Sequence, residues 1–357
     1  MQEAELPALA AQVLWAAFVL GALFGAVAQR THFCTMGAVA DIVNMGDWTR
    51  MRMWALAAGV AILGFNTMVA LGWVEAGKSI YAAPRLLWLS HVLGGLLFGV
   101  GMVLASGCGS KTLVRIGGGS LKAVVVFVVL GVSAYMTMRG LFGVWRVASV
   151  DAVALTLPTG QDLPSLLARA TGVGRPMLAH LLSVVIGGGF VAWALWRPEG
   201  RRGEVLLAGL GVGAVIVAVW WVSGRLGHLA EHPQTLEEAF LATNSGRMES
   251  LTFVAPVAYT LDWLMLFSDK SKVLTIAIVT TVGVIAGSAG VALATRTFRW
   301  EGFGGTEDTA NHLVGAMLMG AGGVTALGCT VGQGLSGVST LALGSFITVG
   351  AIMAGAV

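Results

Sequence analysis

Long stretches without charged side chains restrict the fold of this chain more than any other feature. The uncharged runs cover residues 8–28, 53–74, 86–110, 176–196, 205–224, 273–295 and 309–357. Most of them reach the roughly 20 residues that an α-helix needs to cross the hydrocarbon core of a bilayer. Because every backbone polar group must be satisfied inside lipid, such runs predict helices. The fold class is therefore an all-α, polytopic membrane helix bundle.

We expect about nine spans and one transmembrane domain over residues 1–357. The uncharged stretch 309–357 is too long for one membrane helix, and the glycine-rich GCTVGQGLSG at 328–337 divides it. The weakly apolar segment 251–267 contains Pro256 and Asp262, so we interpret it as a re-entrant or interfacial piece. The expected spans are about 8–28, 53–74, 86–106, 121–142, 176–196, 205–225, 273–295, 312–327 and 336–356.

Composition excludes several classes of protein. The chain is 56% hydrophobic and 11% charged, which fits no soluble class. Its net charge of +3 forms no basic stripe, so we expect no nucleic-acid surface. Three widely spaced cysteines make neither a disulfide framework nor a zinc pair. We therefore predict no metal site and no cofactor, although soft thiolates keep Cu(I) transport as a chemical competitor.

A self-match at a fixed offset indicates an internal repeat. HVLGGLLFGVGMVLASGC at 91–108 matches HLVGAMLMGAGGVTALGC at 312–329, with nine of eighteen positions identical. We interpret the chain as a first half at 1–146, a connector with a central helix at 147–199 and a second half at 200–357. An odd number of crossings between the halves inverts the second one relative to the first. Inverted repeats place transport sites near the midplane, between broken helices, so the cysteine-bearing breaks are the predicted pathway.

The predicted breaks combine glycine, cysteine and small polar residues. GCGSKT at 107–112 and GCTVGQG at 328–334 each follow a predicted helix and precede another. The N-terminus of a helix offers free N–H groups and a favourable dipole to an anion. The alternative is that these glycines are packing hinges and that the thiols merely fill space. The candidate substrate-binding residues are Cys34, Cys108, Cys329, Gly107, Gly109, Gly328, Thr330, Gln333 and Lys111.

Three motifs give the sequence a family resemblance. They are QRTHFCTMGAVADIVNMGDW at 29–48, SGCGSKTL at 106–113 and LGCTVGQGLSGVSTLALGS at 327–345. With these motifs the chain resembles the YeeE/YedE family, in particular its thiosulfate transporters. The resemblance implies a bacterial inner-membrane protein whose Cys34, Cys108 and Cys329 line a central path and hydrogen-bond the terminal sulfur of thiosulfate. It also implies a cytoplasmic TusA-like sulfur-carrier partner, and it leaves other sulfur or selenium compounds open as substrates.

Two further expectations concern mechanism. The main alternative function is a membrane thiol enzyme that catalyses sulfur transfer or disulfide exchange, which needs a second thiol within reach. We expect no enzyme activity. We also expect uptake to be pulled by consumption inside the cell, because the predicted helices show no chain of carboxylates for a proton relay and only Asp41, Asp47 and Asp262 lie near the predicted centre. Lys and Arg are distributed almost evenly between the two sides. The acidic N-terminus and RPEGRRG at 197–203 favour a periplasmic N-terminus and a cytoplasmic C-terminus.

Overall fold

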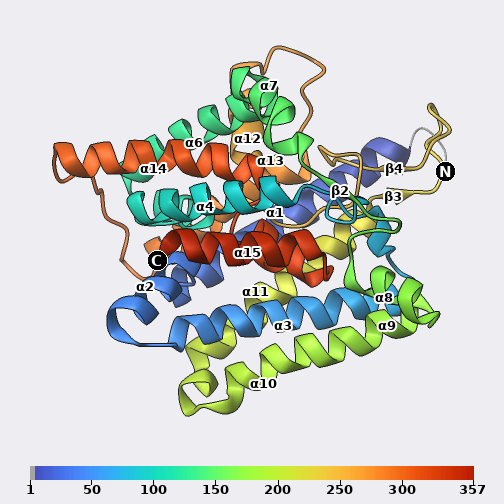
Figure 1. Cartoon of the computed structure of the whole chain (residues 1–357). Helices are drawn as coiled ribbons and strands as arrows, with labels where there is room; N and C mark the ends of the chain where they lie inside the picture. The colour runs from blue at the N-terminus through green and yellow to red at the C-terminus, as the bar shows by residue number, and fades with distance from the viewer. Residues whose placement is uncertain (1–4) are drawn as a thin grey trace.

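A computed structural model describes residues 5–357 as a bundle of α-helices with four two-residue strands (Figure 1). The helices up to residue 148 are α1 (Leu6–Thr31), α2 (Thr35–Met45), α3 (Thr49–Ala70), α4 (Trp88–Leu104), α5 (Gly109–Gly117), α6 (Leu121–Arg139) and α7 (Leu141–Ala148). The connector contains α8 (Leu163–Thr171), α9 (Arg175–Leu182) and α10 (Gly188–Trp196). The remaining helices are α11 (Gly203–Trp221), α12 (Ala255–Met265), α13 (Ile276–Ala294), α14 (Thr306–Thr325) and α15 (Leu343–Ala356).

Seven helical runs within residues 5–357 are long and apolar enough to cross a membrane. They coincide with the first seven expected spans, and they confirm the all-α polytopic bundle. The last two expected spans fall on α14, which begins with an acidic first turn, and on α15, which has 14 residues. The count of nine spans therefore stays a prediction. The runs are Leu6–Met45, Thr49–Ala70, Trp88–Gly117, Leu121–Arg139, Arg175–Trp196, Gly203–Leu226 and Ile276–Ala294.

The helices of the two halves pack in reciprocal pairs. Helix α1 packs on α13 while α11 packs on α3, and α4 packs on α15 while α14 packs on α6. Helices α4 and α14 also pack on each other. If α11, α12, α13, α14 and α15 are matched with α1, α2, α3, α4 and α6, exchanging the halves turns each of these contacts into another one of the set. An internal two-fold repeat produces this pattern, so the packing supports the predicted repeat.

Glycines let α4 and α14 cross with their backbones in contact. A Cβ atom added to Gly101 would lie 2.7 Å from the carbonyl oxygen of Gly315, and one added to Gly94 would lie 2.7 Å from that of Gly322. The self-match aligns Gly94 with Gly315 and Gly101 with Gly322. The two contacts are therefore equivalent: each joins a glycine of one repeat to the glycine that matches the other glycine of its own helix. Small residues permit this close approach, which van der Waals packing stabilises in a membrane.

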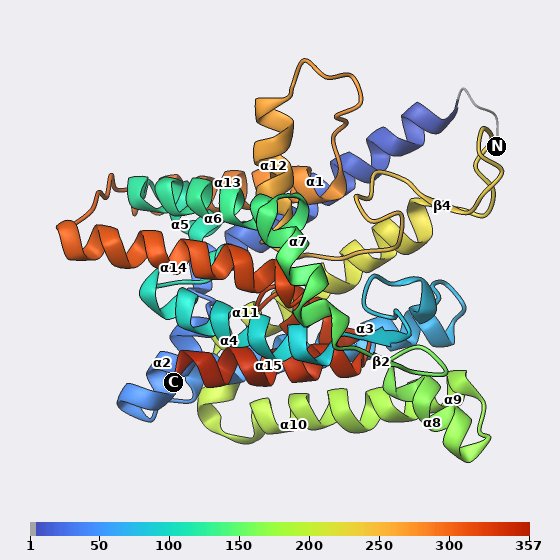
Figure 2. The same ribbon diagram turned by 45° about the horizontal axis from the view of Figure 1, so that its top comes forward.

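Two short strand pairings lie in the connections between helices. Strands β1 (Arg85–Leu86) and β2 (Leu155–Thr156) pair antiparallel, with Arg85 opposite Thr156. Strands β3 (His228–Leu229) and β4 (Ala239–Phe240) pair antiparallel, with His228 opposite Phe240. Figures 1 and 2 place the start of α1 with β4 at one end of the bundle, and α2 with the C-terminus at the other. The molecule thus has two ends whose loops differ.

Candidate functional site

All three cysteines lie where a helix begins. Cys34 is the N-cap of α2, and its Sγ accepts a hydrogen bond from the backbone N–H of Gly37 at 3.4 Å. Cys108 is the N-cap of α5. Cys329 follows α14, and its Sγ accepts from the N–H of Gly332, the first residue of a π-helical turn, at 3.4 Å. The three thiols therefore share one environment, the positive end of a short helix.

The cysteines are buried, unoxidised and near one another. Their exposed fractions are 8% for Cys34, 1% for Cys108 and 0% for Cys329. The Cys34 and Cys108 thiols are close enough to interact directly, and Cys108 also faces Thr330 beside Cys329. The order along the buried line is therefore Cys329, Cys108 and Cys34.

Small polar groups surround these thiols. The hydroxyl of Ser110 lies 3.2 Å from the sulfur of Cys108, and that of Thr252 lies 3.9 Å from the sulfur of Cys329. Thr330 is 2% exposed, and within residues 5–357 its hydroxyl has no hydrogen-bond partner by geometry. The Thr330 hydroxyl is therefore placed beside Cys108 and Cys329, and its role in binding substrate stays a prediction.

The predicted glycines allow close approach around the thiols. A Cβ atom on Gly107 would lie 2.9 Å from Cγ of Lys111, and one on Gly109 would lie 2.6 Å from the carbonyl oxygen of Phe253. A Cβ atom on Gly328 would lie 3.0 Å from Cγ of Gln333. Gly109 therefore lets the start of α5 approach the backbone of Phe253, whereas Gly107 and Gly328 make room for side chains of their own turns.

Gln333 is occupied by the protein itself. Its Nε2 donates to the carbonyl oxygen of Ala326 at 2.7 Å, and its Oε1 accepts from the hydroxyl of Ser345 at 2.6 Å. Both polar ends of the amide are therefore taken. In this structure Gln333 holds the Cys329 turn against α15 instead of offering a free donor to a substrate.

Lys111, three residues after Cys108, lines a cavity of about 350 Å³ at the α2 end of the molecule. We call it the basic cavity. Arg115 and Arg299 also line it, and so does His32, two residues before Cys34. Glu301, the acidic residue in its wall, is neutralised by Lys122 at 2.9 Å. The basic cavity is therefore suited to an anion, and it lies next to Cys34 and Cys108.

A second cavity, of about 240 Å³, lies at the end where α1 begins; we call it the Glu249 cavity. Its wall includes Arg146, Glu249 and Tyr259, and it reaches Thr252 and Gly328 beside Cys329. Sequence reasoning missed Glu249, which is 8% exposed. Asp41 and Asp262, expected near the centre, instead form ion pairs with Arg50 at 3.3 Å and with Lys272 at 2.6 Å.

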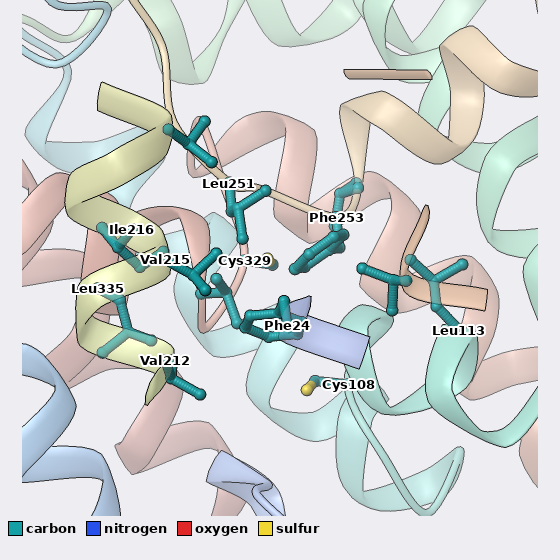
Figure 3. Packing of buried hydrophobic residues seen from close by; sticks show 14 of the residues in the cluster. Phe24, Cys108, Leu113, Val212, Val215, Ile216, Leu251, Phe253, Cys329 and Leu335 are labelled. Carbon is teal, nitrogen blue, oxygen red and sulfur yellow. The ribbon is translucent and has the colours of Figure 1, made fainter. Parts of the chain in front are cut away.

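Two buried phenylalanine rings lie next to the cysteines. Phe24 from α1 and Phe253 from the segment before α12 are both 0% exposed, with ring centroids 5.2 Å apart. Figure 3 shows the Phe24 ring between Cys329 and Cys108 and the Phe253 ring beside Cys329. Sequence reasoning missed this pair because phenylalanine is ordinary in an apolar run. We expect these buried rings to form an apolar barrier between the two cavities.

The fold and the site together define a class of protein. A helical membrane bundle holds a buried line of thiols, and a cavity with charged side chains in its wall approaches this line from each end. This arrangement is that of a membrane transport protein. The model of the Sulphur transport family matches residues 30–357, and the chain belongs to that family, which confirms the resemblance noted in the sequence.

Curated relatives agree with this assignment. The chain is 27% identical to the thiosulfate transporter TsuA of Escherichia coli (strain K12) over 322 residues, which cover 89% of this chain and 85% of the relative. It is 27% identical to the thiosulfate transporter TsuA of Spirochaeta thermophila over 350 residues, or 94% of each chain. A shorter match of 101 residues, covering 28% of this chain and 23% of the relative, is 31% identical to the probable transporter YedE of Salmonella typhimurium.

Proposed function

We propose that this protein imports thiosulfate through a path that runs from the Glu249 cavity past Cys329, Cys108 and Cys34 to the basic cavity. The observation that carries the proposal is the line of three buried thiols, each at the start of a helix, between two cavities that have charged side chains in their walls. The two relatives that cover about nine-tenths of the chain are thiosulfate transporters, which supports the choice of substrate.

The chemistry of the thiols accounts for selectivity. Thiosulfate differs from sulfate by one soft, weakly hydrated sulfur, and a thiol is a weak donor that suits this atom. Sulfate is held best by strong N–H and charged donors. A path in which S–H groups donate to the terminal sulfur, while helix N-termini and Lys111 compensate the charge, therefore favours thiosulfate.

We place the protein in the inner membrane of a bacterium, with the N-terminus periplasmic and the C-terminus cytoplasmic. The Glu249 cavity is then the entrance and the basic cavity the exit. The division into halves at 1–146 and 200–357, inverted about the connector 147–199, belongs to this proposal and is supported by the reciprocal helix packing. Reporter fusions in the loops after α3 and α13 test it, because an inverted repeat places those two loops on opposite sides.

Consumption of thiosulfate on the cytoplasmic side, the cytoplasmic sink, supplies the free energy for net uptake. Moving a dianion inward against about 100 mV costs roughly 4.6 kcal/mol, so passive entry does not accumulate it. A TusA-like sulfur-carrier protein that consumes thiosulfate near the exit would pull the flow. We place its docking surface around Arg197, Arg201 and Arg202, in the loop between α10 and α11.

One observation favours a second candidate, a thiol enzyme. Cys34 and Cys108 interact directly, so a second thiol is within reach for disulfide exchange or sulfur transfer. We nevertheless propose non-covalent passage, because helix N-termini and two cavities also provide a route for an ion. A serine at position 108 separates the two functions, since a hydroxyl donates a hydrogen bond but forms no disulfide or persulfide.

The test is uptake of radiolabelled thiosulfate into liposomes that contain the purified protein. We expect uptake well above that of empty liposomes, competition by unlabelled thiosulfate and weak competition by sulfate. Absence of uptake, or equal competition by sulfate, contradicts the proposal.

A further inference from the structure

The Glu249 cavity contains two buried polar atoms that lack partners. Within residues 5–357, neither Oε1 of Glu249 nor Nε of Arg146 has a hydrogen-bond partner. Both side chains line the same cavity, one as an acceptor and the other as a donor. Buried polar groups are normally hydrogen-bonded, so an orphan pair beside a cavity indicates a ligand.

The surroundings hold both groups in place. The hydroxyl of Ser223 donates to the carbonyl oxygen of Glu249 at 2.6 Å, and the hydroxyl of Ser245 donates to Oε2 of its carboxyl at 3.1 Å. Arg146 pairs with Asp151 at 2.9 Å through its Nη1, which leaves its Nε–H free. The site is therefore built before any ligand enters it.

A negative charge on Glu249 does not fit this place. A buried carboxylate would repel an approaching dianion strongly, because the medium around it is of low dielectric constant. A carboxylic acid, in contrast, donates a hydrogen bond through its O–H. Burial raises the pKa of Glu249 to about 7, although hydrogen bonds from Ser245 and from the backbone of Asn244 act in the opposite direction.

We infer that the Glu249 cavity is an oxyanion-binding site in which Arg146 donates through Nε–H and Glu249 donates as a carboxylic acid, so that capture of the dianion takes up one proton. The inference deepens the proposed function and rests on it. The proton comes from the aqueous phase at the entrance and binds Oε1 of Glu249, while the anion stays chemically unchanged. One carboxyl at the entrance is not a relay across the membrane, so the cytoplasmic sink remains the drive.

The other ionisable groups facing Glu249 have different roles. Burial raises the pKa values of Tyr81 and Tyr259, so both phenols stay protonated near neutral pH. The guanidinium of Arg146 can only donate hydrogen bonds. Asp151 is engaged by Arg146 and by the hydroxyl of Ser90, which donates to it at 2.6 Å. Glu249 is therefore the described group around this cavity that we expect to titrate near pH 7.

The first experiment measures initial uptake of labelled thiosulfate into liposomes at equal pH on both sides, from pH 6 to pH 8, below saturation. With a pKa of about 7, the protonated fraction of Glu249 falls about tenfold over this range, and the wild-type rate should fall with it. Glu249→Gln, which is permanently neutral, should give a nearly flat profile. The control is Glu238→Gln. Glu238 lies in the same connection as Glu249 and forms an ion pair with Lys78, and its variant should keep the wild-type pH profile.

The second experiment needs no variant. Thiosulfate added to the weakly buffered wild-type protein in detergent at pH 7.5 should raise the signal of a pH dye, because each binding event takes up most of one proton. Binding without proton uptake overturns the inference, and so does a Glu249→Gln profile as steep as that of the wild type. A wild type that takes up no thiosulfate at any pH instead refutes the proposed function.

Discussion

The crossing of α4 and α14 gives a prediction that the structure makes quantitative. An alanine Cβ at position 101 would lie 2.7 Å from the Gly315 oxygen, about 0.7 Å inside the 3.4 Å at which ordinary contact begins. The backbones must move apart, because the opposing atoms are main-chain atoms. Overpacking of this kind costs about 1–3 kcal/mol, which corresponds to roughly 2–10 °C in melting temperature.

The change also reaches the site. Gly101 and Gly322 each lie seven residues before a cysteine, Cys108 and Cys329 respectively. Separating the helices at the crossing therefore displaces the thiols relative to each other. We expect Gly101→Ala and Gly322→Ala to lower the melting temperature by similar amounts, because the two positions are equivalent in the repeat, and both to reduce thiosulfate uptake.

Melting followed by fluorescence-detected size exclusion, with uptake measured on the same preparations, tests this prediction. The matched controls are Gly290→Ala in α13 and Gly350→Ala in α15, where an added Cβ meets nothing within 4 Å. Alanine in a helix is favoured over glycine by up to about 1 kcal/mol, so the controls should melt at or slightly above the wild-type temperature. Crossing variants as stable and active as these controls refute the reasoning.

Two further variants test the path itself. Phe24→Ala removes one ring of the barrier, and we expect sulfate entry to rise about two- to tenfold, in line with the roughly 0.5–1.5 kcal/mol of an aromatic pair; unchanged sulfate exclusion would contradict the barrier. Lys111→Gln removes a half-buried charge beside the thiols, and we expect the KM for thiosulfate to rise about tenfold or more. The control Lys270→Gln, on an exposed loop, should leave KM unchanged, and an equal effect of both variants would remove Lys111 from the path.

The sequence predicts those parts of this protein that depend on local pattern. Uncharged runs of membrane length locate the spans because lipid requires them, and each Gly-Cys pair lies at a helix break because glycine ends a helix readily. The sequence does not predict that α2 and α12 are short helices of equal length, 11 residues each. In the predicted repeat, Val254, the N-cap of α12, corresponds to Cys34 before α2, so the predicted second half has no thiol at this position.

Residues whose role depends on tertiary contacts escape such reasoning. Glu249 belongs to an acidic, polar stretch that resembles a surface loop, and its burial follows from contacts with Ser223 and Ser245. Gln333 looks like a free donor beside Cys329, but Ser345 and Ala326 take its amide. Phe24 lies in an apolar run whose composition is that of any membrane helix. No local pattern distinguishes these three cases.

Replacement of Cys108 tests the central claim most directly, because this thiol lies in the middle of the line. A hydrogen bond to a charged group contributes about 1.5–3 kcal/mol, so Cys108→Ala should lower the initial rate of thiosulfate uptake into liposomes by roughly 10- to 150-fold, with folding intact. Cys108→Ser, which keeps a donor, should retain more activity than Cys108→Ala. An alanine variant that transports at the wild-type rate contradicts the account, whereas a serine variant as inactive as alanine favours covalent sulfur chemistry.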